Sequence, residues 1–86
     1  MRPSPRSRVA ARLLLLHRIE AEHDAVAGGR SLRVSQQQLA LMTALSRQSI
    51  SRVLHELAQT GAIAVGFRRI GIRDPLALEA VANSFG

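Results

Sequence analysis

The fold is decided by residues 34–63, VSQQQLALMTALSRQSISRVLHELAQTGAI. Ser35 begins a Ser-Gln-Gln-Gln sequence in which the serine hydroxyl and the third glutamine can bond two free backbone amides at the start of a helix. That helix is brief, because Ser46 offers the N-cap of a second helix a few residues later. Two helices joined by a tight turn at Thr43-Ala44-Leu45 are therefore predicted. The first helix is expected to turn inward Leu39, Ala40 and Met42.

The second helix is predicted over about residues 47–60 and is followed by Gly61, since glycine most easily adopts the left-handed conformation just past a helix. Its apolar residues recur at i, i+3, i+4 and i+7 and define a buried face: Ile50, Val53, Leu54 and Leu57. The remaining polar residues form one outward surface without a carboxylate: Arg47, Gln48, Ser51, Arg52 and His55. Arginine can form two hydrogen bonds with guanine, and glutamine can do so with adenine, so this surface suits the major groove of DNA. An ordinary solvated helix face is the alternative interpretation.

The residues before this stretch predict a helix and a short strand. Apolar residues recur at helical spacing over residues 9–23 and give an unusually wide apolar stripe, which Gly28-Gly29 interrupts. Residues 31–34 then alternate between polar and apolar in the manner of a half-buried strand. Residues 1–8, MRPSPRSR, carry two prolines and three arginines and are expected to form a disordered basic arm.

The residues after the second helix predict a β-hairpin and a closing helix. Residues 63–73 hold two alternating runs separated by a turn at residues 66–68, with Arg68 and Arg69 at the tip. These arginines can grip a sugar-phosphate backbone, or they can simply keep a sheet edge from aggregating. Asp74-Pro75 then offers an N-cap and a first helical residue. The element order predicts a mainly α fold with a small β-wing, a winged helix-turn-helix, over residues 9–86.

Composition favours an anionic partner. The 86 residues suffice for one small domain, and they include 12 arginines, no lysine and a formal net charge of +6. This charge favours nucleic acid first and an acidic membrane surface second. Phe67 and Phe85 are the only aromatic residues in the sequence, too few for the stacking platforms of single-strand binders. Duplex DNA is therefore the preferred candidate.

Residues 34–63 resemble the DNA-binding end of the Crp/Fnr family of bacterial transcription regulators, and residues 66–78 resemble that family's wing and terminal helix. The most specific matches are Leu39-Ala40, Leu45-Ser46-Arg47, Ser51-Arg52-Val53-Leu54, Leu57 and Gly61-Ala62-Ile63. The resemblance implies a regulator that binds duplex DNA with sequence preference, with a homodimer on an inverted repeat as a possible form. It also implies that Ser46 caps the recognition helix and that Arg47 and Arg52 contact bases or adjacent phosphates. The sequence shows no signal-peptide pattern and no membrane span, so we expect the chain in the cytoplasm.

The sequence departs from the family pattern at two residues. Gln48 stands where many members carry a glutamate that accepts a hydrogen bond from cytosine, so a different base is expected at that point. Ala44 stands where many members carry glycine, so the turn is strained if it requires a positive φ. The sequence contains no match to the family's effector-binding β-barrel or long dimerisation helix. We therefore expect no small-molecule effector site in this chain.

Catalytic, cofactor and metal sites are not predicted. The sequence has no glycine-rich phosphate loop, nucleophile elbow or paired carboxylates, and it has no cysteine for thiol catalysis or a Cys-type zinc site. His17, Glu20 and His23 share a helix at spacings typical of some metal sites. Matching ligands on other helices are lacking, so we expect these side chains to be solvated.

Two binding alternatives remain besides DNA. A winged helix can serve as a protein-docking module, but a docking helix should offer aromatic or large apolar anchors where this one offers arginine, glutamine and serine. An amphipathic helix over residues 8–23 could lie on a membrane surface, although its apolar stripe is more simply explained as core. The longest strictly apolar run, Leu13–Leu16, is too short to cross a bilayer.

Overall fold

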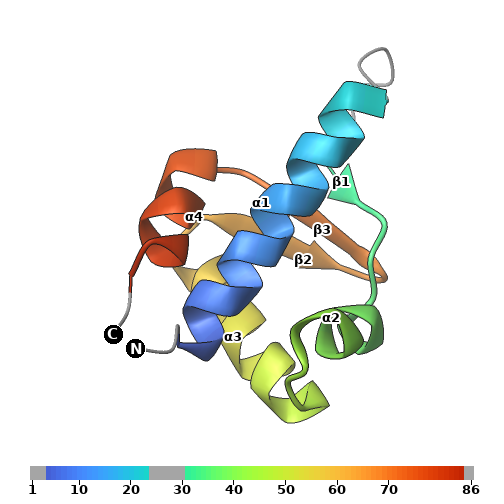
Figure 1. Ribbon diagram of the computed structural model, residues 1–86, viewed down its shortest axis with the longest axis vertical. Helices are drawn as coiled ribbons and strands as arrows, with labels where there is room; N and C mark the ends of the chain where they lie inside the picture. The colour runs from blue at the N-terminus through green and yellow to red at the C-terminus, as the bar shows by residue number, and fades with distance from the viewer. Residues whose placement is uncertain (1–3, 24–30, 85–86) are drawn as a thin grey trace.

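The computed structural model describes residues 4–23 and 31–84, and for residues 21–23 it describes the backbone only. Within these residues, four helices pack around a three-stranded antiparallel sheet (Figure 1). In chain order the elements are α1 (Pro5–His23), β1 (Ser31–Leu32), α2 (Gln36–Thr43), α3 (Arg47–Gln59), β2 (Ile63–Gly66), β3 (Arg69–Ile72) and α4 (Pro75–Ala82). The predicted element order and the mainly α fold with a β-wing are confirmed. The predicted break at Gly28-Gly29 lies outside the described residues.

α1 begins at Pro5, so the prediction of a disordered arm over residues 1–8 is wrong for its second half. The Ser4 hydroxyl accepts a hydrogen bond from the backbone amide of Ser7 at 3.1 Å, which is the geometry of an N-cap. Pro5 suits the first helical position because the amide that proline lacks would have no partner there. The first three residues of the predicted arm lie outside the described residues.

The sheet has the strand order β1-β3-β2. β2 and β3 form the predicted hairpin, and the pairing of Gly66 with Arg69 leaves Phe67 and Arg68 as its turn. β1 pairs with the other edge of β3, with Leu32 opposite Ile70. The residues just before α2 are thereby attached to the wing.

The core lies between the four helices and one face of the sheet. Its large buried side chains are Val9, Leu13, Leu32, Val34, Leu39, Ile50, Val53, Leu54, Leu57, Ile63, Ile70, Ile72 and Leu78. The four apolar residues predicted to form the inner face of α3 are each at most 2% exposed. Each such burial stabilises the fold by roughly 1.5–3 kcal/mol, before the entropy of ordering is subtracted.

The wide apolar stripe predicted for α1 is only partly covered. Val9 and Leu13 are completely buried, whereas Leu15 and Ile19 remain 43% and 45% exposed. Figure 1 shows α1 lying across the sheet, with α4 beside its N-terminal half. No helix in the described part of the chain is both long and apolar enough to span a membrane.

α2 turns a different set of residues inward than predicted. Leu39 and Ala40 are buried as expected, but Met42 is 40% exposed and Thr43 is buried in its place. The buried residues Leu39, Ala40 and Thr43 are at positions i, i+1 and i+4, which lie on one face of a helix. Thr43 tolerates burial because its hydroxyl donates a hydrogen bond to the carbonyl of Leu39 at 2.6 Å.

The turn between α2 and α3 is held by α1. Ala44 occupies the left-handed region with φ of 57°. The Arg8 guanidinium donates to the carbonyl of Thr43, and the Arg12 guanidinium donates to that of Met42 at 3.4 Å. These carbonyls belong to the last turn of α2, where helices leave acceptors without partners. α1 therefore fixes the point from which α3 starts.

We expect Ala44→Gly to raise the free energy of unfolding by about 0.5–1 kcal/mol, because relief of the left-handed backbone outweighs the added entropy of the unfolded chain. Urea titration of both proteins measures this difference. Ala80→Gly, at an exposed position of α4, is the matched control and should lower the free energy of unfolding by about 1 kcal/mol. A loss at position 44 similar to that at position 80 would contradict the assignment of strain.

Candidate nucleic-acid interface

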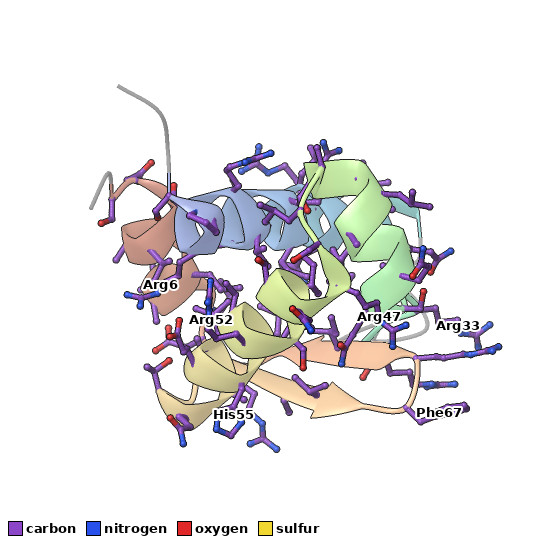
Figure 2. All side chains as sticks on the ribbon, turned by 90° about the horizontal axis from the view of Figure 1, so that it is seen from below. Arg6, Arg33, Arg47, Arg52, His55 and Phe67 are labelled. Atoms are coloured by element: carbon purple, nitrogen blue, oxygen red, sulfur yellow. The ribbon has the colours of Figure 1, made fainter. Side chains whose placement is uncertain are left out.

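α3 lies at the surface with its polar side turned outward (Figure 2). Ser46 caps it, because its hydroxyl accepts a hydrogen bond from the backbone amide of Ser49 at 3.1 Å and donates one to the Ser49 hydroxyl at 3.0 Å. The side chains that the sequence singled out for DNA contact are all exposed: Ser46, Arg47, Gln48, Ser51, Arg52, His55, Arg68 and Arg69. The burial of the opposite face keeps the α3 residues of this set accessible.

A groove of about 940 Å³ lies beside the N-terminus of α3, and we call it the arginine groove. It is lined by residues 33–38, by Arg47 and by residues 65–70 of the wing. Four arginines contribute to its walls: Arg33, Arg47, Arg68 and Arg69. Figure 2 shows Arg47 and Arg33 on the side of the molecule where Phe67 projects from the wing tip. A groove with this charge suits a run of phosphates.

The N-terminus of α2 opens into the arginine groove. Its capping box is formed as predicted, with the Ser35 hydroxyl accepting from the amide of Gln38 at 3.1 Å and the Gln38 side chain accepting from the amide of Ser35 at 2.8 Å. The amide end of a helix carries a partial positive charge. α2 therefore adds to the positive potential that the arginines create.

Arg52 lies farther along the outward surface than Arg47 and is close to Arg6 of α1 (Figure 2). Both side chains line a smaller hollow of about 250 Å³ together with Glu56. Glu56 accepts hydrogen bonds from Arg6, at 3.3 Å from Nε and 3.2 Å from Nη2. The only carboxylate of α3 is thus neutralised by α1, and Arg52 keeps its guanidinium for an external partner.

The interface has a surplus of unpaired cations. Among the side chains of residues 4–20 and 31–84, the contact between Arg6 and Glu56 is the only ion pair. Arg47, Arg52 and Arg69 therefore have no carboxylate partner among the described residues. Arg68 lies over the ring of Phe67, with 5.4 Å between the guanidinium carbon and the ring centroid. These groups remain hydrated and able to bind an anion.

Arg33 and Arg6 also belong to this surface, and neither was predicted from the sequence. Arg33 was treated only as an outward residue of a short strand, and it joins the arginine groove because β1 pairs with the wing strand β3. Arg6 was placed in a disordered arm, although Ser4-Pro5 is a helix start of the same kind as Asp74-Pro75. The first omission had no local signal, whereas the second did.

The chain is similar to known bacterial transcription regulators in both sequence and structure. Residues 7–81 match the model of the Crp-like helix-turn-helix domain. The transcriptional regulator LdrP of Thermus thermophilus is 41% identical over 56 residues, which are 65% of this chain and 29% of the relative. The chain spans less than half the length of the relatives it matches.

Two solved structures resemble nearly the whole chain. The catabolite activator protein of Thermus thermophilus superposes with a TM-score of 0.80 and 32% identity, over 95% of this chain and 35% of that protein. A Crp/Fnr-family transcriptional regulator from the same species superposes with a TM-score of 0.81 and 29% identity, over 98% of this chain and 43% of that one.

We expect Ser46→Ala to lower the free energy of unfolding by about 1 kcal/mol, because the first amides of α3 lose their cap. Chemical denaturation measures this loss. Ser51→Ala, within the exposed side of the same helix, should be neutral or slightly stabilising, since alanine is the better helix former. Equal effects of the two substitutions would show that the cap does not stabilise α3.

Proposed function

Because the chain belongs to the family of Crp-like helix-turn-helix domains, we propose that it binds duplex DNA with sequence preference and so regulates transcription. The observation that carries the proposal is the position of α3. This helix buries its apolar face and offers an exposed polar surface beside the arginine groove. Bacterial DNA lies in the cytoplasm, and the proposal places the chain there.

In the proposed complex, α3 enters the major groove with its capped N-terminal half. Arg47, Gln48, Ser51 and Arg52 contact base edges or the adjacent phosphates, and His55 contacts a phosphate farther along the helix. Gln48 suits adenine, because its amide can donate to N7 and accept from the exocyclic amino group. The preferred half-site should therefore have adenine at the base that Gln48 contacts, where family members with glutamate at this position select cytosine.

One phosphate strand runs through the arginine groove in this complex. Arg68 and Arg69 grip it from the wing, and Arg33 contacts it from the segment before α2. Contacts to phosphate fix the register of the protein on the duplex without reading sequence. The wing and the groove therefore supply affinity, while the outward surface of α3 supplies specificity.

We also propose that two copies bind an inverted repeat, with half-sites about one helical turn apart. Each copy then places one α3 in the major groove on the same side of the duplex. No effector is assigned to this chain. A single copy neutralises few phosphates, so its binding should be measured at low salt.

Selection from a random duplex library at a stated salt concentration tests the proposal. The enriched duplex should contain a common motif and should outcompete random duplex in a titration. Failure to enrich any motif would refute sequence preference. Binding to a protein partner that persists after nuclease treatment, without any duplex affinity, would support a docking module instead.

We expect Arg47→Ala to weaken binding to the enriched duplex by about 1–3 kcal/mol and to relax specificity at one base pair. Titration against the enriched duplex and its single-base variants measures both effects. Arg18→Ala removes the same charge from an exposed position of α1 outside the arginine groove, and it serves as the control. Equal losses on enriched and random duplex would argue against a base contact by Arg47.

We expect Arg68→Ala to weaken binding to all duplex sequences to a similar degree, because it removes a phosphate contact. The slope of the logarithm of the binding constant against that of the salt concentration should fall by about one unit. Titrations at several salt concentrations, again with Arg18→Ala as control, measure this slope. An unchanged slope would exclude a phosphate contact by Arg68.

A further inference from the structure

The wing tip carries an apolar side chain that the fold does not use. Phe67 is 89% exposed, and Figure 2 shows it projecting away from the body of the molecule. The guanidinium of the next residue, Arg68, lies over its ring. Arg68 itself has φ of 55°, an unfavourable backbone conformation for a side chain other than glycine. The fold thus holds a ring and a cation together at the tip without burying either.

The arginine groove separates the wing tip from α3. Arg47 and the start of α2 form one wall, and the wing residues 65–70 form the other. With α3 in the major groove and a phosphate strand in the arginine groove, the wing tip lies on the far side of that strand. The major and minor grooves of a duplex adjoin each other across every strand. The far side of the strand is therefore the minor groove.

We propose that Phe67 enters the minor groove of the flanking DNA and that Arg68 and Arg69 bind the phosphates beside it. This inference rests on the proposed function, because it takes the position of α3 on the duplex as given. Phe67 contacts the sugars and base edges that form the walls and floor of the groove. Proteins that use the minor groove insert apolar side chains of this kind.

Charge complementarity favours DNA over a protein partner at the tip. Phe67 is followed directly by two arginines, and the wing residues that line the arginine groove include no acidic residue. A partner must therefore offer negative charge around an apolar recess. The minor groove has this arrangement, since phosphates border a groove whose walls are deoxyribose.

An apolar contact and an ionic contact differ in their salt dependence. Burial of a phenylalanine ring tightens binding about tenfold or more, and it releases no counterion. Loss of the ring should therefore weaken binding without changing the salt slope. Loss of Arg68 should change the slope, as stated above.

The test compares Phe67→Ser with Leu76→Ser. Leu76 is 76% exposed on α4 and lies outside the arginine groove, so its substitution removes exposed apolar surface without touching the wing. Because both side chains are exposed, thermal unfolding of both variants should match that of the wild-type chain. On the duplex that the wild-type chain enriches, Phe67→Ser should bind about tenfold or more weakly with an unchanged salt slope, while Leu76→Ser should bind normally.

A second duplex locates the contact. Replacing guanine by inosine in the base pairs flanking the enriched motif removes an amino group from the minor groove and leaves the major-groove edge unchanged. This replacement should raise the affinity of the wild-type chain and of Leu76→Ser, because the ring gains room. It should leave the affinity of Phe67→Ser unchanged.

Four results would overturn the inference. Phe67→Ser binding with wild-type affinity would show that the ring makes no contact, and the proposed function would still stand if Arg47→Ala loses specificity. A lower salt slope for Phe67→Ser would show that the ring acts only through Arg68. An equal effect of inosine on wild type and Phe67→Ser would remove the contact from the minor groove. A wild-type chain that binds no duplex would refute the proposed function itself, and the inference with it.

Discussion

The structure depends on the burial of one face of α3. Ile50, Val53, Leu54 and Leu57 are almost completely buried between α1, α2 and the sheet. Since a helix has only one side opposite such a face, Gln48, Arg52 and His55 must face solvent. The neighbouring elements support this arrangement. α1 holds the turn before α3, and the wing begins shortly after Gly61, which follows the end of α3. The polar surface is thus exposed as a consequence of core packing.

The positive charge of the chain serves two purposes. Arg8 and Arg12 donate to carbonyls at the end of α2, and Arg6 neutralises Glu56 on α3. These three arginines stabilise and position the helix-turn-helix unit. Those around the arginine groove and on the outward surface of α3 have no carboxylate partner in the described parts of the chain. Net charge indicated the class of partner, and packing decided which arginines remain available to it.

Local signals account for most of what was predicted correctly. Ser35, Ser46 and Asp74 each bond a backbone amide at a helix start, and Gly61 has φ of 83° just past α3. Each cap joins two residues that are three positions apart, so both partners can be recognised in a short stretch of sequence. The prediction of a disordered arm was wrong for residues 5–8. The arginines and prolines of this segment were given more weight than the N-cap signal at Ser4. The predicted burial of Met42 was wrong because α2 has only about two turns. So few turns do not show from apolar spacing which face of the helix is buried.

The sequence by itself determined the helices, the hairpin and the polar side of α3, because hydrophobic periodicity and capping act between residues close in the chain. The arginine groove was decided only by the tertiary structure. It requires β1 to pair with β3, which brings Arg33 to the wing, and it requires the wing to stand beside the start of α3. The pairing of β1 with β3 joins residues more than 30 positions apart. Backbone hydrogen bonds make this pairing, and the spacing of residues within one strand does not identify its partner strand.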